Sequence, residues 1–368
     1  MKKKDTVLLC GLIIVEFFII KYFQFHFLPA KYFYDSNKIL RMVLYNIRYK
    51  DLAYDFTANL FSFFNFLQLT SLKQWAYFIG FFFSIILFII LLKNKKYSLE
   101  QYLFIYSSVA LLNIYIFNIS KDIIQFIIFL IIYLILKNER FKNKKKVILI
   151  TSLLLLESVF FRVYYAIMAV MIIAIYYLYN KLLYNKEINK KTVTKIITLS
   201  LTIFFSVVFI VSLISNNNYQ RIIHARYGVN SLRSNDMDAN TMINDLFGRN
   251  NTYFTFVFNY IMNAFRLMIP IELLVKGIKY IPFIIYQTYL TILIFKSSKK
   301  INKQNVLLLI TIISFLIVSI IFEPDFGSFI RHESAMFLMF LELTMINKHN
   351  TNDIAFNCLK EDSYETNE

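Results

Sequence analysis

Long apolar runs separated by short polar stretches dominate the hydropathy pattern of this chain. The run from 78 to 92, for example, contains no charged residue. A helix needs roughly 20 apolar residues to cross the hydrocarbon core of a bilayer, and several runs approach or reach that length. The pattern predicts an all-α, polytopic integral membrane protein with about 10 transmembrane helices. The expected spans are residues 6–21, 74–92, 99–117, 119–136, 147–160, 163–179, 196–215, 271–295, 306–322 and 333–346.

Lysine-rich clusters between the apolar runs predict the orientation of the chain. Cytoplasmic loops of membrane proteins carry an excess of Lys and Arg. With ten spans, every cluster falls on the same side, which predicts an N-in, C-in topology. The clusters comprise Lys2, Lys3 and Lys4; Lys93, Lys95 and Lys96; Lys137, Arg140, Lys142, Lys144, Lys145 and Lys146; Lys181, Lys186, Lys190, Lys191 and Lys195; and Lys296, Lys299, Lys300 and Lys303.

This topology predicts a single transmembrane domain over residues 1–347, with a disordered cytoplasmic tail at 348–368. The outer side carries two long loops, 22–73 and 216–270. The first holds short amphipathic stretches rich in Phe and Tyr, which suit an interfacial helix. The second turns apolar from 253 to 269. An eleventh span there would put the last Lys cluster on the opposite side from the earlier ones. We therefore expect an interfacial or re-entrant helix.

Composition and charge agree with a membrane protein and exclude other classes. The chain is 58% hydrophobic, against roughly 45–50% in soluble domains. Its net charge of +17 does not indicate nucleic-acid binding, because the Lys clusters lie between apolar runs. Cys10 and Cys358 have neither metal-ligand nor disulfide spacing. The sequence contains no metal-ligand set, Gly-rich phosphate loop, GxSxG elbow or ATP motif, so we expect no metal and no cofactor.

Arginine is distributed unevenly and gives the first candidate chemistry. Nine of the ten Arg residues fall on the predicted outer side, whereas the inner loops use Lys. A guanidinium is a planar, permanently charged fork that binds phosphate or carboxylate through two hydrogen bonds. Salt bridges and lipid headgroup contacts are the structural alternative. The candidates for binding an anionic substrate are Arg162, Arg221, Arg226, Arg233 and Arg331.

Two short segments add groups that can transfer protons. The turn between the last two spans contains Glu323, Asp325, Arg331 and His332, so a carboxylate or imidazole can take a proton while Arg holds an anion. Asp325 acting as a helix cap is the alternative. In the second outer loop, His224 lies three residues after Arg221 and shares its helix face. A solvated surface helix is the alternative for that loop.

Ionisable residues in or near the predicted spans are further candidates, because such groups are costly in lipid and commonly functional. Glu16, Lys121, Asp122, Glu157 and Arg162 are of this kind. Asp236 and Asp238 match the letters of a DxD motif, which holds a metal and a nucleotide sugar. They fall on the predicted outer side, where nucleotide sugars are not expected, so we interpret them as surface residues.

The pattern as a whole resembles the bacterial Wzy-type polysaccharide polymerases of exopolysaccharide and capsule loci. The resemblance covers the topology and the segments Tyr34-Asp35-Ser36-Asn37, Ser120-Lys121-Asp122, Phe161-Arg162-Val163-Tyr164-Tyr165 and the Glu323–His332 turn. It implies a multi-pass protein of the bacterial inner membrane that transfers a growing glycan from an undecaprenyl-diphosphate carrier to a new lipid-linked repeat unit. Its partners would be that lipid-linked oligosaccharide, membrane lipids and a chain-length regulator.

Within this hypothesis the Arg residues, Lys121 and Glu323 bind the substrate, and Asp325, His332, His224 or Asp35 deprotonates the acceptor hydroxyl. Two other functions stay open. A lipid-phosphate-sugar glycosyltransferase that adds one branch sugar would place an acidic residue early in the first outer loop, and Asp35 satisfies this. A flippase for the lipid-linked oligosaccharide would place ionisable residues on both sides of the membrane midplane, whereas here they collect outside.

Overall fold

Helices account for all the regular secondary structure that the chain displays in a computed structural model. The structure describes residues 3–93, 97–183, 190–223, 241–248, 250, 252–299 and 301–345. Within these ranges the fold is all-helical and contains no β-strand, which confirms the predicted class. The chain divides into two compact units: unit 1 comprises residues 1–137, 152–166 and 330–337, and unit 2 comprises residues 138–151, 167–329 and 338–368.

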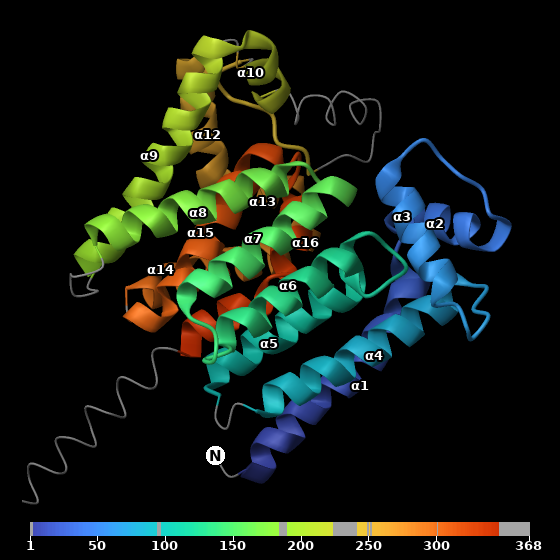
Figure 1. Cartoon of the computed structure of the whole chain (residues 1–368). Coiled ribbons are helices and arrows are strands. Elements are labelled where there is room, and N and C mark those ends of the chain that lie inside the picture. Colours follow the sequence, from blue (N-terminus) through green and yellow to red (C-terminus); the bar gives the residue numbers. More distant parts are fainter. Residues whose placement is uncertain are drawn as a thin grey trace, which may run out of the picture. The chain divides into compact units, whose positions relative to one another are not determined.

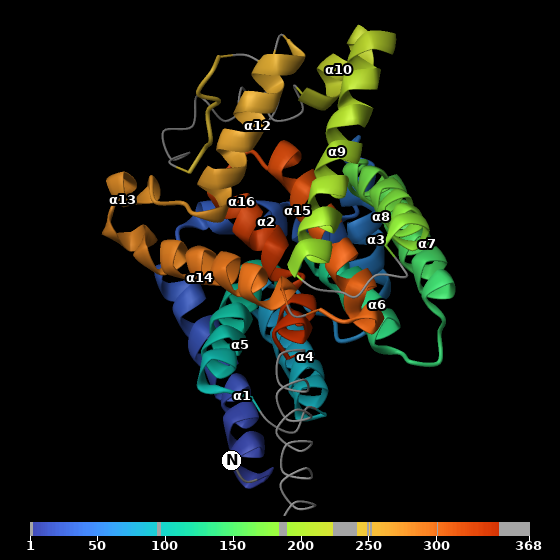
Figure 2. The same cartoon turned by 90° about the vertical axis from the view of Figure 1, so that its left-hand side faces the viewer.

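Unit 1 is built mainly from the N-terminal helices. Its first helix, α1, packs along α4 over much of its length (Figures 1 and 2). Three helices, α7 (Asn143–Phe160), α8 (Tyr164–Leu182) and α16 (Phe326–Ser334), contribute residues to both units. The remaining elements of unit 1 are α1 (Lys3–Phe27), η1 (Ala30–Phe33), α2 (Tyr34–Tyr45), α3 (Leu52–Phe63), α4 (Leu72–Leu92), α5 (Leu99–Leu111), the π-helix η2 (Leu112–Ile116) and α6 (Asp122–Lys137).

A glycine permits the close approach of α1 and α4. A Cβ atom at Gly80 would lie 2.5 Å from Cε2 of Phe17 and 2.8 Å from Cε of Lys21. The Lys21 side chain, fully buried beside Gly80, donates hydrogen bonds to the backbone carbonyls of Asn113 (2.6 Å) and Phe117 (2.7 Å). Helix ends leave such carbonyls without intrahelical partners and favour a nearby cation. Lys21 thereby ties α1 to the end of η2.

Serine caps fix where the next helices begin. The Ser71 hydroxyl accepts a hydrogen bond from Gln74 N, and the Gln74 side chain accepts one from Ser71 N, which is a capping box at the start of α4. Ser98 and Gln101 repeat the arrangement at the start of α5. Both boxes can be recognised in the sequence, because each pairs Ser with Gln three residues later.

Unit 2 is arranged around α15, whose residues 306–321 are all buried. Helices α9 and α12 pack against it (Figures 1 and 2). The Tyr260 hydroxyl of α12 donates to the Ile317 carbonyl of α15 at 3.0 Å. The remaining elements of unit 2 are α9 (Lys190–Ile214), α10 (Asn216–Ile223), α12 (Tyr253–Met268), α13 (Leu273–Lys276), η3 (Ile278–Tyr280), α14 (Ile281–Ser298), η4 (Lys303–Asn305), α15 (Val306–Phe322) and helical residues 338–345.

Five helical segments in the described part of the chain are long and apolar enough to cross a membrane. They are Leu72–Leu92, Tyr164–Leu182, Lys190–Ile214, Ile278–Ser298 and Lys303–Phe322. Each coincides with one of the ten predicted spans. The other five predicted spans fall on α1, on α5 with η2, on α6, on α7 and on the last described helix. Their crossing of a membrane stays a prediction.

The structure defines the helix boundaries in two predicted segments, the span expected from residue 271 and the apolar stretch 253–269. The span expected from residue 271 begins at Ile278, because Gly277, with φ +130°, separates it from the short α13. The apolar stretch 253–269 forms α12, a helix of 16 residues. At about 1.5 Å per residue, α12 is shorter than a hydrocarbon core of roughly 30 Å. Because α6 has the same length and is expected to cross, the placement of α12 stays a prediction.

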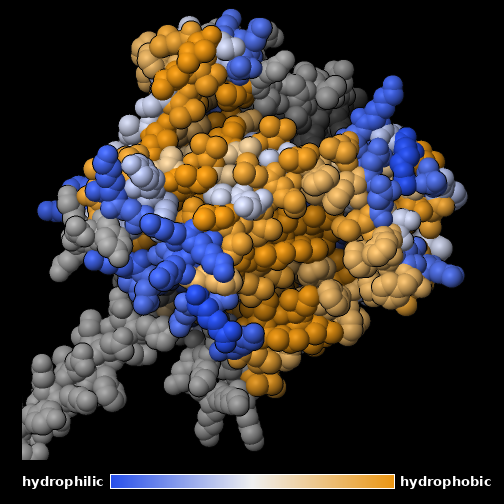
Figure 3. Space-filling model, viewed as in Figure 1, coloured by the Kyte–Doolittle hydropathy of each residue, from blue (hydrophilic) through white to orange (hydrophobic). Residues whose placement is uncertain are grey.

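The surface of unit 1 is apolar over its long helices α5 and α6 and more hydrophilic over the short helices α2 and α3. Figure 3 shows a mostly apolar face over α5 and α6, where Leu103 and Leu134 are exposed. Hydrophilic side chains appear over α2, α3 and the segment between them, where Arg41 of α2 and Arg48 of the segment are exposed. This contrast is what a helix bundle in lipid requires if α2 and α3 lie at the water interface.

Candidate functional site

The carboxylate of Asp122 is the centre of a buried ionic cluster in unit 1. Asp122 is the first residue of α6 and is 7% exposed. Its Oδ1 lies 3.1 Å from Nη2 of Arg162 and 3.5 Å from Nε2 of His332. Its Oδ2 lies 3.4 Å from Nε of Arg331. Three segments that are distant in sequence therefore present their polar groups to one carboxylate.

Each member of the cluster is placed by a helix terminus or a short helix. Arg162 lies in the turn between α7 and α8, where its Nη1 also donates to the Tyr164 hydroxyl at 2.8 Å. Arg331 and His332 are neighbours near the end of α16. Helix termini expose unpaired backbone groups and are natural positions for charged side chains.

The cluster is buried on its Asp and His side and partly exposed on its Arg side. Side-chain exposure is 9% for Asp122 and 5% for His332, against 22% for Arg162 and 28% for Arg331. Two guanidinium groups on one carboxylate leave an excess of positive charge even when His332 is neutral. An anion can therefore approach the guanidinium groups from the solvent side, whereas Asp122 fixes their positions from the buried side.

Lys121 connects this cluster to a second group formed by α2 and α3. The Tyr54 ring lies between two ammonium groups, with Nζ of Lys121 3.7 Å and Nζ of Lys38 3.8 Å from its centroid. The Tyr54 hydroxyl donates a hydrogen bond to the Asp35 carboxylate. Burial, followed by that hydrogen bond, raises the pKa of the Tyr54 phenol above its ordinary range. The phenol is thus a permanent donor to Asp35 at neutral pH.

The structure brings some of the predicted site residues together and separates others. Arg162, Arg331 and His332 come together around Asp122, and Lys121 and Asp35 lie in the adjoining group around Tyr54. Asp325 and Glu323 belong to unit 2. The Asp325 carboxylate accepts a hydrogen bond from Ser328 N at 2.7 Å, which is the capping role that the sequence left as an alternative.

The candidates of the second outer loop stay predictions. His224, Arg226 and Arg233 lie outside the described residues, as do Asp236 and Asp238. Arg221 lies in α10, and its side chain is likewise outside the described part of the structure. The sequence selected Asp122 as an ionisable candidate but gave it no role in the site. Tyr54 and Lys38 were not selected, and Tyr54 is one of 26 tyrosines.

The cluster does not resemble a metal centre. Within the described ranges, no group of three or more His, Cys, Asp or Glu side chains could hold a metal ion. Positive charge at the site comes from Arg and Lys side chains.

Comparison with family models, curated proteins and solved structures finds no match to this chain.

Proposed function

We propose that this chain is a glycosyltransferase of the polysaccharide polymerase type in the bacterial inner membrane. It would cross the membrane about ten times, with both termini in the cytoplasm, and act at the extracytoplasmic face. Its reaction would join undecaprenyl-diphosphate-linked repeat units into a capsular polysaccharide or exopolysaccharide. The observation that carries the proposal is the pair of partly exposed guanidinium groups, Arg162 and Arg331, held on the buried carboxylate of Asp122.

The guanidinium groups would bind the donor diphosphate. When the bond between the anomeric carbon and the phosphate oxygen breaks, the electron pair goes to the diphosphate, whose negative charge increases. Preorganised Arg side chains stabilise such developing charge without a metal. Lys121, adjacent to Asp122 in sequence, adds a further positive charge beside the site.

His332 would deprotonate the acceptor hydroxyl as its oxygen forms the new bond to the anomeric carbon. Imidazole suits this role because one ring nitrogen can accept a proton while the other donates a hydrogen bond. The contact of 3.5 Å with Asp122 would orient the ring and stabilise the imidazolium formed. Asp35 is the second candidate for the base, since the Tyr54 hydroxyl fixes its carboxylate next to Lys121.

Complementation of a deletion strain tests this proposal. Arg331→Ala and Arg162→Lys should abolish or greatly shorten the polymer, while single lipid-linked repeat units accumulate. Gel electrophoresis of the polymer and mass spectrometry of the lipid-linked fraction give the two readouts. Arg41→Ala is the matched control, because Arg41 is an exposed Arg on α2 that is also predicted to lie on the outer side. Normal polymer length and yield in the Arg331→Ala strain would overturn the assignment.

The same strains separate the two alternatives. Intact polymer that lacks one side sugar would favour the branch-sugar transferase, which is supported by the position of Asp35 early in the predicted first outer loop. Repeat units that accumulate on the inner leaflet of the deletion strain would favour the flippase.

A further inference from the structure

Residues 269–280 form an exposed elbow in unit 2, between the end of α12 and the start of α14. The elbow contains α13 and η3, and Figure 2 shows α13 at the margin of the unit, beyond the end of α12. Its exposed side is strongly apolar. Val275 is 91% and Ile278 is 83% exposed, the two highest values among the large apolar side chains of the described residues, and Ile271 and Leu274 are exposed as well.

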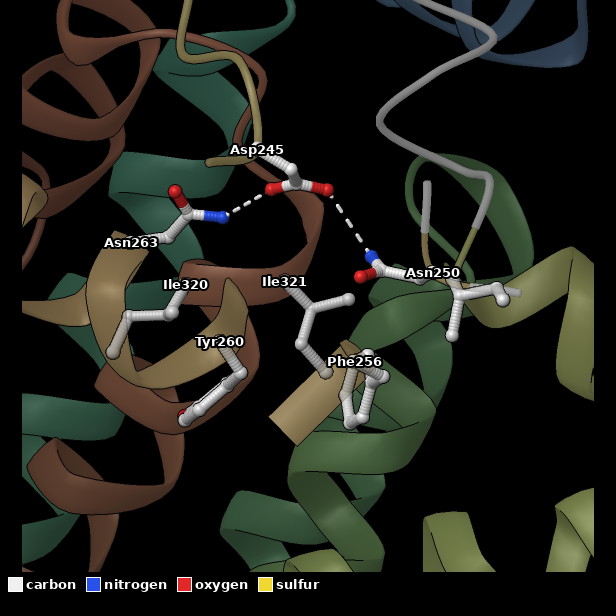
Figure 4. Close-up of a pocket in the computed structure, with 8 residues that line it drawn as sticks. Asp245, Asn250, Phe256, Tyr260, Asn263, Ile320 and Ile321 are labelled. Atoms are coloured by element: carbon white, nitrogen blue, oxygen red, sulfur yellow. Dashed lines mark hydrogen bonds between the residues drawn. The ribbon is translucent and has the colours of Figure 1, made fainter. Parts of the chain in front are cut away.

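A series of hydrogen bonds fixes the backbone of the elbow. Figure 4 shows the first of them, in which Nδ2 of Asn263 on α12 donates to the Asp245 carboxylate at 2.5 Å. Nη1 of Arg266 donates to Oδ1 of Asn263 at 3.2 Å. Arg266 also donates to both carboxylate oxygens of Glu272, at 2.6 and 2.8 Å, and Leu273 beside it is buried. The exposed apolar side chains are therefore presented by a positioned segment.

Two ammonium groups lie among these apolar side chains. Lys276 and Lys279 are exposed, and in the described part of the chain neither forms an ion pair. Nζ of Lys279 lies 5.3 Å from the ring centroid of Tyr280. Glu272 is the single acid of the elbow, and Arg266 already engages both of its oxygens. The elbow therefore offers two positive charges that no neighbouring acid neutralises.

This combination is typical of a segment at the boundary between lipid and water. Apolar side chains of such a segment enter the outer part of the acyl region, while Lys side chains extend their ammonium groups to the level of the headgroups. The elbow leads directly into Ile278–Ser298, a segment long and apolar enough to cross a membrane. The headgroups of the bilayer lie at the end of such a span, so the two ammonium groups and the lipid phosphates meet there.

We propose that the elbow binds the headgroups of anionic phospholipids. Val275 and Ile278 would enter the acyl region, and Lys276 and Lys279 would donate to the phosphate oxygens. Each ammonium beside an anionic membrane surface favours binding about fivefold. A protein partner or a second copy of the chain would instead exclude lipid from Val275 and Ile278. Lipid binding requires no step of the proposed reaction, so either proposal can fail without the other.

Quenching of tryptophan fluorescence by brominated lipids tests the proposal in the full-length protein. Ile278→Trp and, separately, Val275→Trp place a reporter on the elbow, and the signal of the buried Trp75 is subtracted by measuring the parent protein. The vesicles contain phosphatidylcholine and phosphatidylglycerol in equal amounts, with bromine on the chains of only one of the two. Brominated phosphatidylglycerol should quench the reporter more strongly, with an enrichment of about fivefold or more at low salt. The enrichment should fall in about 1 M NaCl, which screens the ammonium groups.

Paired lysine variants identify the source of the enrichment. Lys276→Gln combined with Lys279→Gln should remove it, while both lipids still quench the reporter. Lys296→Gln combined with Lys299→Gln is the matched control, because these two exposed lysines lie at the other end of α14. The control pair should leave the enrichment at the elbow unchanged.

Three outcomes would overturn the proposal. The first is equal quenching of the reporter by the two brominated lipids in the parent background. The second is an enrichment that persists after replacement of Lys276 and Lys279. The third is the absence of quenching by either lipid at both Val275→Trp and Ile278→Trp, which would show that protein or water covers the elbow.

Discussion

The Asp122 carboxylate accepts a hydrogen bond from the Arg162 guanidinium at 3.1 Å, although 40 residues separate the two in sequence. The bond joins the first residue of α6 to the turn between α7 and α8. Arg331 and His332 reach the same carboxylate from α16. Asp122 is therefore the residue on which the placement of the cationic groups depends.

Replacement of Asp122 should impair both the fold of unit 1 and the proposed reaction. In Asp122→Ala, Arg162, Arg331 and His332 lose their common acceptor, at a cost of roughly 1–3 kcal/mol for the charged contacts removed. In Asp122→Asn, size is retained but the charge is lost. We expect Asp122→Asn to fold with a lower melting temperature and to produce little polymer. Wild-type levels of polymer from Asp122→Asn would show that the carboxylate does not position the Arg residues.

Lys21 should contribute strongly to the stability of unit 1. Its ammonium group donates to the Asn113 and Phe117 carbonyls and to the Asn118 side chain. Lys21→Met should remove this donor from both carbonyls, at about 1–3 kcal/mol for each one left unsatisfied, whereas the Asn118 side chain keeps its hydrogen bond from Nε2 of Gln24. The sole tryptophan, Trp75, is buried in the same unit, so its fluorescence reports unfolding of this region. We expect the melting temperature measured in this way to fall by several degrees.

Lys73→Met provides the control for that measurement, because Lys73 is exposed on the first turn of α4. Gly80→Ala should destabilise the same contact by another route, since the added Cβ would clash with Phe17 and Lys21. Equal melting temperatures for Lys21→Met and Lys73→Met would contradict the structural role of the buried ammonium.

The stability of unit 1 should depend on pH through Tyr54 in the alkaline range. Burial and the hydrogen bond to Asp35 raise the pKa of the phenol above its ordinary value of about 10. The folded state therefore retains a proton that the unfolded state releases. The resulting stabilisation is complete below pH of about 10 and decreases as the pH rises further. Thermal unfolding followed by Trp75 fluorescence at several pH values measures this effect.

Tyr54→Phe is the matched variant for the pH experiment. It keeps the ring between Lys38 and Lys121 but removes the hydroxyl that donates to Asp35. The wild-type protein should be the more stable of the two at neutral pH, and the difference should narrow above pH 10. A constant difference across that range would show that the Tyr54 proton is not linked to folding.

The sequence by itself determined the class of the fold and the approximate position of its helices. Long apolar runs predict helices because a backbone in lipid must satisfy its hydrogen bonds internally. Five predicted spans coincide with segments able to cross a membrane. The capping boxes at Ser71 and Ser98 were also readable, because a cap involves residues three apart.

The candidate site was predictable only in part. Residue type and predicted side were enough to select Arg162, Arg331 and His332, since few other residues bind anions or transfer protons at neutral pH. The sequence grouped Asp325 with Arg331 and His332 because all three lie in one short segment. The structure instead gives Asp325 a bond to Ser328 N and gives the other three a common contact with Asp122.

The tertiary structure alone decided which charges meet and which polar residues turn inward. Contacts such as Asp122 with Arg331, or Tyr54 with Lys121, join segments that no local pattern relates. Likewise, α12 contains both Asn and Phe, and only its packing against α15 shows that the Asn residues are buried and the Phe residues exposed. Helix formation depends on neighbours in sequence, whereas a site depends on how helices pack. Because most helix faces of this chain are apolar, the sequence pattern does not reveal which faces meet.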